Sequence, residues 1–170
     1  PDAKLTSSER AQWTAYHALI ENTLFWCLVW NRGKNIMWET EPIGFFDSLP
    51  PLKKFLFKQK MKKYQGLAWK GAQVQGIGLL SQLDMEKVAK KSLDSLEDFM
   101  GTKPFFFGPT PTTLDLTAFG HLAQFLYTPL QSNDIKNHIE NNCPRLFSMF
   151  TRLKETYWSD WEEATENRSL

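Results

Sequence analysis

The sequence predicts an all-α protein, a bundle of five or six helices. Three segments, at Thr6, Ser81 and Thr112, have the Ser/Thr-x-x-Asp/Glu spacing with which many helices begin. No segment alternates apolar and polar residues as a strand would, and no stretch repeats. At 170 residues the chain has the length of one domain. We expect this domain over residues 1–161, followed by a frayed polar tail at 162–170.

The first helix is expected to run from Thr6 to about Asn31. Thr6 and Glu9 have the spacing of a capping box, and Gly33 is a stop signal. The apolar positions follow the i, i+3, i+4 pattern of an amphipathic helix: 13, 16, 20, 23, 24, 27 and 30. This pattern lapses over residues 34–48, which are predicted to form a loop.

A short lysine-rich helix is expected from Pro51 to about Tyr64, because Pro50 and Pro51 fit the start of a helix. The next segment, 66–78, has four glycines in thirteen residues. Glycine is unfavourable inside helices. The sequence therefore predicts an irregular segment there.

Four further helices complete the predicted bundle. One begins at Ser81 and stops at Gly101. The central helix begins at Thr112, and a shorter one is expected over about 132–141. Pro144 opens the last helix, which ends near Trp158.

Thr112 and Asp115 form the most informative of the predicted capping boxes. The threonine hydroxyl can accept from the amide of residue 115, while the carboxylate accepts from the amide of residue 112. The helix that follows is almost entirely apolar as far as Tyr127, so it is expected to be enclosed on most sides. We interpret this pair as structural, with no contact to a substrate.

Composition excludes several classes of function. The net charge of +1 gives no overall attraction to nucleic acid, and no such partner is expected. The two cysteines, Cys27 and Cys143, are interpreted as free thiols of a reducing compartment. No stretch reaches the roughly 18–20 apolar residues of a membrane span. The expected location is cytoplasmic, with association to a membrane surface as an alternative.

No catalytic residue and no metal site is predicted from motifs. The histidines, His17, His121 and His138, lack the close spacing of metal ligands. The G-x-S-x-G turn of a serine nucleophile is absent. His121 is interpreted as a core histidine bonded to a nearby carbonyl, and the alternative is a polar group in a ligand pocket.

The segment Lys53–Lys70 combines lysines with Phe, Met, Tyr and Trp. Seven lysines and no acidic residue lie between Ser48 and Leu83. One interpretation is a basic amphipathic helix that contacts an anionic membrane or an acidic partner. The other, which we favour at this point, is a solvated helix whose lysine stems cover apolar surface.

The run Gly-x-x-x-Thr-x-x-Asp, residues 108–115, resembles the start of the central helix in the C-terminal domain of glutathione S-transferases. Its continuation to Gln124, the Asn-Cys-Pro-x-Leu motif at 142–146 and the Tyr-Trp-Ser-Asp-Trp motif at 157–161 are similar to the failed-axon-connections and metaxin branch of that superfamily. The Gln-Gly-Ile-Gly turn at 75–78 is also similar. A basic residue is expected next, but Leu79 stands there. The resemblance covers about residues 6–161.

This resemblance implies the helical half of a two-domain protein, with a thioredoxin-like domain expected upstream. In such transferases the helical half provides the hydrophobic wall for a co-substrate that is conjugated to glutathione. By position, that ligand pocket falls on Trp13, Tyr16, His17 and Ile20. Packing in the core or between domains is the alternative role for these side chains.

Two functions therefore remain open from the sequence. One is a glutathione transferase, with glutathione as its co-substrate. The other is a non-catalytic module that docks a partner or a membrane through Lys53–Lys70. Candidate partners are the thioredoxin-like domain, a second copy in a homodimer, and an acidic protein or membrane surface.

Overall fold

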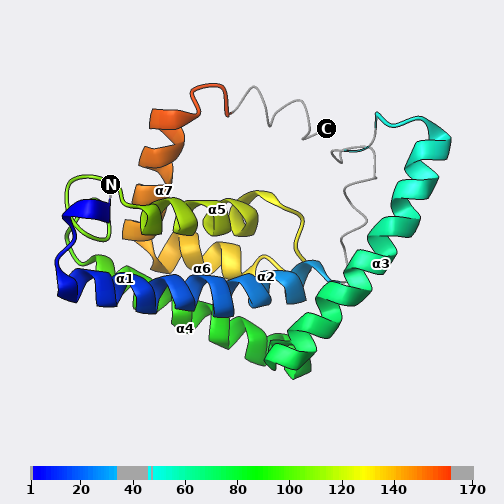
Figure 1. The fold of residues 1–170 in the computed structure, drawn as a ribbon, viewed down its shortest axis with the longest axis horizontal. Coiled ribbons are helices and arrows are strands. Elements are labelled where there is room, and N and C mark those ends of the chain that lie inside the picture. The colour runs from blue at the N-terminus through cyan, green and yellow to red at the C-terminus, as the bar shows by residue number, and fades with distance from the viewer. Residues whose placement is uncertain (1, 34–45, 47, 162–170) are drawn as a thin grey trace.

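The computed structural model describes residues 2–33, 46 and 48–161 (Figure 1). The predicted loop at 34–48 falls largely outside the described residues, as does the polar tail at 162–170. The remaining segments form a helical bundle from which one long helix projects (Figure 1).

The first predicted helix is continuous, with a change of pitch in its middle. It consists of α1 (Ser7–Leu19), a π-helical turn (Ile20–Leu24) and α2 (Phe25–Arg32). Thr6 and Glu9 form the predicted capping box at its start. In the π turn, the Phe25 amide donates to the Ile20 carbonyl, five residues back. This wider turn rotates the following residues relative to a regular helix.

The second helix is much longer than predicted. α3 spans Pro51–Gln75, so the expected end near Tyr64 and the expected irregular segment at 66–78 are wrong. Gly66 and Gly71 lie inside the helix, and the helix stops only at Gly76, which has a left-handed φ of 101°. A short 3₁₀ turn, Ile77–Leu79, follows. Glycine lowers helix propensity by about 1 kcal/mol, a cost that the neighbouring turns of a long helix can absorb.

The other four helices confirm the prediction to within about two residues. They are α4 (Gln82–Met100), α5 (Thr113–Tyr127), α6 (Asp134–Asn142) and α7 (Pro144–Tyr157). With the first helix counted once, the described ranges contain six α-helices. Their only strand-like pairing is an isolated bridge between Phe105 and Gly108. The all-α fold class is therefore confirmed.

α5 is the centre of the bundle. It packs against α1, α2, α6 and α7, while α4 packs against α2, α6 and α7 (Figure 1). Leu114, Phe125 and Leu126 of α5 are buried together with apolar side chains of every neighbour. The nearly all-apolar sequence of α5 is explained by this enclosure.

Aromatic rings close the end of the bundle beside α7. Trp158 stacks on Phe119 with ring centroids 4.6 Å apart, and Trp161 lies edge-on to Tyr127 at 5.2 Å. The two tryptophans thus cover this end of the core. Among the described helices, none combines the length and the apolar character needed to cross a bilayer.

Candidate functional site

The structure brings three of the four predicted pocket residues together on α1. Trp13 stacks on His17 with ring centroids 4.5 Å apart, and Tyr16 stacks on Phe99 of α4 at 3.9 Å. All three are half-buried. Ile20, at 0 % exposure, belongs to the core and presents no surface. The pocket role of Trp13, Tyr16 and His17 stays a prediction.

Contacts to the start of α5 hold this aromatic face in place. The Trp13 indole N–H donates to the Thr113 hydroxyl at 3.2 Å. The Asp2 carboxylate accepts from the Thr113 amide at 3.0 Å and from its hydroxyl. These bonds, with the hydroxyl first, hold the pKa of Asp2 below its usual range. The N-terminal turn is thereby fixed against α5.

Thr112 and Asp115 form the capping box of α5 deep inside the protein. The Thr112 amide and hydroxyl both donate to Asp115 Oδ2 at 2.7 Å, and the Phe106 amide donates to Oδ1 at 2.8 Å. Burial raises the pKa of Asp115, and these hydrogen bonds offset part of the rise. The pair therefore joins the loop at Phe106 to the start of α5 and has no access to a ligand.

A small cavity of about 150 Å³ lies between α2, α3 and α5. Arg32 on its wall donates to the Gln124 amide oxygen at 2.6 Å. Ligand pockets are commonly about 300–1,000 Å³, so this cavity is too small for a typical co-substrate. His121 of α5 bonds through Nδ1 to the Thr117 carbonyl at 2.9 Å, which agrees with the interpretation as a core histidine.

The outer side of α3 exposes both large apolar side chains and lysines. We call it the α3 surface. Only Ala72 of the 25 residues of this helix is buried. The exposed large apolar side chains are Leu52, Phe55, Leu56, Tyr64, Leu67 and Val74. The exposed lysines are Lys53, Lys60, Lys62, Lys63 and Lys70.

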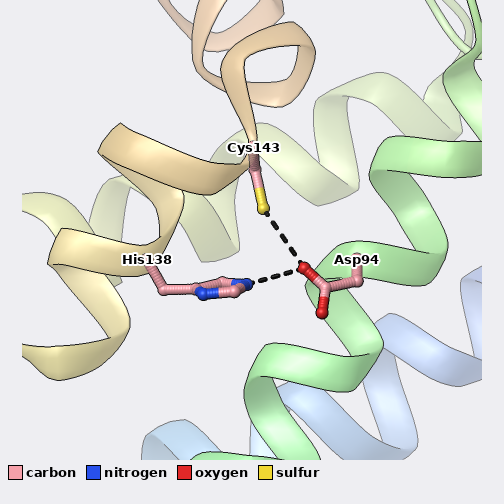
Figure 2. Close-up of side chains that lie close together, drawn as sticks. All are labelled: Asp94, His138 and Cys143. Atoms are coloured by element: carbon pink, nitrogen blue, oxygen red, sulfur yellow. Dashed lines mark hydrogen bonds and ion pairs between the residues drawn. The ribbon is translucent and has the colours of Figure 1, made fainter.

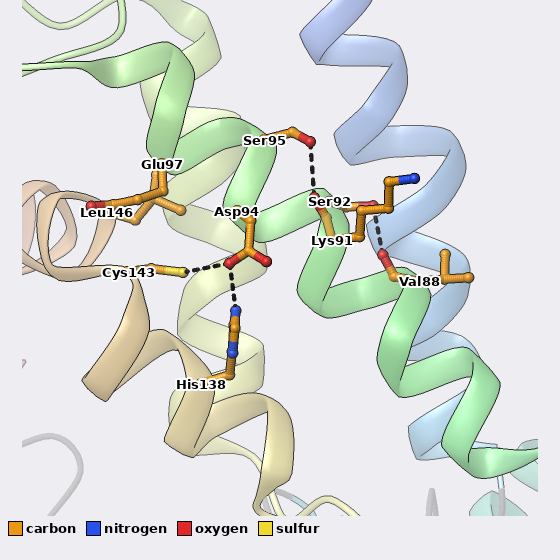
Figure 3. A network of polar contacts seen from close by, with 9 residues as sticks. All are labelled: Val88, Lys91, Ser92, Asp94, Ser95, Glu97, His138, Cys143 and Leu146. Carbon is orange, nitrogen blue, oxygen red and sulfur yellow. Dashed lines mark hydrogen bonds and ion pairs between the residues drawn. The ribbon is translucent and has the colours of Figure 1, made fainter.

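Glu97 is a buried carboxylate that no sequence motif indicated. It lies on α4, where it accepts from the Arg145 and Leu146 amides of α7 at 3.0 and 2.9 Å and from the Arg145 guanidinium at 2.7 Å. Figure 3 shows it beside Leu146, one turn along α4 from Asp94. Glu97 thus satisfies the first amides of a helix whose own N-cap residue makes no side-chain cap.

Asp94, His138 and Cys143 form a second group that the spacing did not reveal (Figure 2). His138 Nε2 lies 2.7 Å from Asp94 Oδ1, and Cys143 Sγ lies 3.9 Å from the same oxygen. Burial, and then the neighbouring carboxylates, raise the pKa of the Cys143 thiol to about 12. The imidazole faces Asp94, so it cannot take the thiol proton directly. The separation of five residues between His138 and Cys143 was the only signal in the sequence.

Comparison with known proteins finds a family model that matches part of the chain. Residues 89–153, which contain α5, α6 and most of α4 and α7, match the model of the glutathione S-transferase C-terminal domain. Over these residues the chain is similar to the glutathione S-transferase C-terminal domain. No solved structure matches the chain significantly.

Curated relatives resemble almost the whole chain. Failed axon connections of Drosophila melanogaster is 33 % identical over 95 % of the chain and 41 % of its own length. Metaxin-2 of Mus musculus is 28 % identical over 92 % of the chain and 59 % of its own length. Metaxin-3 of Danio rerio is 30 % identical over 94 % and 52 %, respectively. The chain thus spans about half the length of these relatives, and their branch is the one that the sequence motifs indicated.

Proposed function

We propose that this domain is a non-catalytic docking module that binds an anionic membrane surface through α3. The observation that carries this proposal is the α3 surface. Seven lysines and no acidic residue lie between Ser48 and Leu83, and large apolar side chains are exposed among them. The favoured sequence interpretation, a merely solvated helix, does not account for that apolar exposure.

Three of the exposed apolar side chains of α3 lie along one side of the helix. Leu56, Leu67 and Val74 are separated by 11 and 7 residues, which are close to whole numbers of helical turns. They are 54, 55 and 91 % exposed. A row of exposed apolar side chains over several helical turns is typical of a surface that binds a membrane or a protein partner.

Three lysines lie along the same side of α3 as these apolar residues. Lys63 and Lys70 lie between these apolar residues on the helix, and Lys60 lies at their edge. Each lysine near an anionic lipid surface contributes about 1 kcal/mol to binding, while aliphatic and aromatic groups enter the headgroup region. A second copy of α3 is a poor occupant, because its lysines would oppose these lysines. The shape of α3, which projects from the bundle (Figure 1), lets it lie against a broad surface.

Vesicle co-sedimentation with a matched pair of triple variants tests this function. One carries Lys60→Gln, Lys63→Gln and Lys70→Gln. The control carries Lys4→Gln, Lys87→Gln and Lys91→Gln, three exposed lysines outside α3. We expect the unchanged protein and the control to bind vesicles of phosphatidylcholine with phosphatidylserine. The α3 variant should bind several-fold more weakly, since surface attraction depends on these charges.

The same co-sedimentation experiment is repeated at different salt concentrations and with different lipids. Binding should weaken as salt shortens the Debye length from about 30 Å at 0.01 M to about 8 Å at 0.15 M. Vesicles of phosphatidylcholine alone should bind little. Equal loss in both triple variants, or no binding to phosphatidylserine, would reject the membrane proposal. Binding to a polyglutamate-coated surface without any binding to vesicles would indicate an acidic protein partner instead.

A second proposal keeps the transferase role for a protein that also has a thioredoxin-like domain. The observation in its favour is the half-buried face formed by Trp13, Tyr16 and His17, which offers apolar rings with polar edges. This face would orient an electrophile while the other domain activates the glutathione thiol. The family alone does not imply activity.

Glutathione affinity and conjugation test the second proposal in the two-domain protein. We expect retention on immobilised glutathione and conjugation of a generic electrophile. Trp13→Ala should raise KM for the electrophile with little change in KM for glutathione. A folded two-domain protein that neither binds glutathione nor conjugates the electrophile would exclude a transferase.

A further inference from the structure

Three side chains of different chemistry converge where α4 meets the junction of α6 and α7 (Figure 2). Asp94 comes from α4, His138 from α6, and Cys143 from the residue between α6 and α7. One carboxylate oxygen, one ring nitrogen and the sulfur all lie within 4.8 Å of one another. Residues 44 and 49 positions apart in the sequence are thus brought to one point.

We propose that Asp94, His138 and Cys143 bind one zinc ion. Sulfur, imidazole nitrogen and carboxylate oxygen are the donor atoms that zinc takes in proteins. Magnesium and calcium prefer oxygen ligands alone, so the cysteine and histidine favour zinc among common divalent ions. A water molecule would complete a tetrahedral site.

The spacing of the donor atoms suits this ion. Zinc lies about 2.0–2.1 Å from nitrogen, about 2.0–2.2 Å from oxygen and about 2.3 Å from sulfur, which places tetrahedral ligand atoms roughly 3.2–3.7 Å apart. The oxygen–nitrogen separation of 2.7 Å and the oxygen–sulfur separation of 3.9 Å lie on either side of this range. Zinc binding would therefore require the Asp94 and His138 side chains to rotate and bring both separations into this range.

Solvent exposure decreases from Asp94 through His138 to Cys143. The Asp94 side chain is 53 % exposed and that of His138 is 16 % exposed, while Cys143 is completely buried. An ion can thus enter from the Asp94 side and meet the sulfur at the floor of the site. Binding transfers the thiol proton to solvent, and no oxidation or reduction is involved.

The backbone around the site is fixed by groups that do not compete for the ion. Both Glu97 oxygens are used by the amides at the start of α7, so Glu97 positions Cys143 without being available as a ligand. Figure 3 shows Asp94 and Glu97 on the same helix, with Cys143 and Leu146 facing them. An ion here would tie α4 to the α6–α7 junction.

Metal titration of the chelator-treated protein tests the site, with zinc and cobalt chloride as the probes. We expect one tightly bound zinc per chain, measured by competition with a chromophoric chelator. Cobalt should give a thiolate-to-cobalt charge-transfer band together with the intense visible bands of tetrahedral cobalt. Zinc should also raise the melting temperature, because it binds only the folded arrangement.

Variants locate the ion. Asp94→Asn changes an exposed side chain, so the fold should be retained, and we expect zinc affinity to fall roughly tenfold or more. Cys143→Ser should abolish the charge-transfer band. Two matched controls, Cys27→Ser at the other buried thiol and His17→Gln at another half-buried histidine, should keep both the affinity and the spectrum.

Two results would overturn the proposal. One is the absence of stoichiometric zinc binding by the folded, unchanged protein. The other is a pair of unchanged measurements: folded Asp94→Asn binds zinc as tightly as the unchanged protein, and folded Cys143→Ser gives the same cobalt spectrum. The ion would then lie elsewhere. If Cys143→Ser does not fold, the affinity of Asp94→Asn decides alone.

Discussion

At the scale of single residues, the carboxylates of two capping boxes have pKa shifts of opposite direction. Glu9 and Asp115 both occupy the third residue of a helix and accept from the threonine before it. The exposed Glu9 has its pKa lowered by these hydrogen bonds, chiefly the one from the Thr6 amide. Burial raises the pKa of Asp115 despite its three donors. The effect of burial outweighs the hydrogen bonds at Asp115, whereas the hydrogen bonds outweigh it at Glu9.

Replacing Asp115 should destabilise the protein strongly. Asp115→Ala leaves the amides of Phe106 and Thr112 and the Thr112 hydroxyl without partners inside the protein. Buried unsatisfied groups cost about 1–3 kcal/mol each, and we expect a loss of about 3 kcal/mol in the free energy of unfolding, measured in urea. The matched change Glu9→Ala, at an exposed box, should cost several times less. Similar losses in the two variants would contradict this account.

The pH dependence should differ between these carboxylates. A lowered folded pKa, as at Glu9 and Asp84, stabilises the folded state above the unfolded pKa. That stabilisation is lost as pH falls through the folded value. A raised folded pKa, as at Asp115, has the opposite effect: stability falls as pH rises from the unfolded to the folded value.

Thermal melts from about pH 6 to about pH 3, across the usual carboxyl pKa values of roughly 3.9–4.3, measure this difference. Glu9→Gln and Asp84→Asn should each reduce the loss of stability on acidification. Asp115→Asn, compared with the unchanged protein, should steepen the loss, because the carboxyl that gains from protonation is gone. An unchanged slope in Glu9→Gln would show that its hydrogen bonds do not persist in solution.

At the scale of helices, α7 depends on a residue of α4 for its start. Pro144 lacks an amide proton, and the next two amides donate to Glu97. Charge-assisted bonds to helix amides are among the stronger hydrogen bonds of proteins. Neighbouring helices here are thus coupled through a cap as well as through apolar packing.

Glu97→Ala should loosen the start of α7. We expect a loss of about 2–3 kcal/mol and faster hydrogen exchange at the Arg145 and Leu146 amides, measured by NMR. Asp98→Ala, at the exposed neighbouring position, is the control and should leave both quantities nearly unchanged. Unaltered exchange at Leu146 in Glu97→Ala would show that water replaces the carboxylate.

Glycines of α3 and of the turn after it should respond in opposite directions. A methyl group at Gly66 meets no atom within 4 Å, whereas at Gly78 it would lie 2.6 Å from the Gln73 backbone nitrogen. Gly66→Ala should therefore stabilise the protein by about 0.5–1 kcal/mol, and Gly78→Ala should destabilise it by about 1–3 kcal/mol. Urea unfolding measures both. Destabilisation by Gly66→Ala would argue against a helix through that position.

At the scale of the whole molecule, stability should decline from α5 to the outer half of α3. α5 has buried residues in every turn, while α3 has only Ala72 buried, close to its C-terminal end. Where backbone hydrogen bonds can break without exposing the apolar core, the amide hydrogens exchange through local fluctuations. The molecule thus has a firm bundle and a weakly supported outer helix.

Hydrogen exchange followed by mass spectrometry should show this gradient. Peptides covering residues 51–64 should exchange much faster than peptides covering 113–127, and phosphatidylserine vesicles should slow exchange in the first set alone. Lys60→Gln, Lys63→Gln and Lys70→Gln together should remove the effect of the vesicles. Equal protection of the two helices without vesicles would contradict the gradient.

The sequence by itself determined where most helices start, because caps, glycine stops and apolar periodicity act within a few residues, and its motifs indicated the resemblance to a family. The starts at Thr6, Ser81 and Thr112 could be predicted for that reason. The length of α3 could not, since a glycine penalty of about 1 kcal/mol is small beside the cooperativity of a long helix.

Only the tertiary structure decided which polar groups meet. Glu97 reaches the α7 amides, and Asp94 reaches His138 and Cys143, across 44 to 49 residues of sequence. Whether a carboxylate such as Asp115 is buried also depends on every helix packed around it. These features have no local signal, because long-range packing sets both their distances and their solvation.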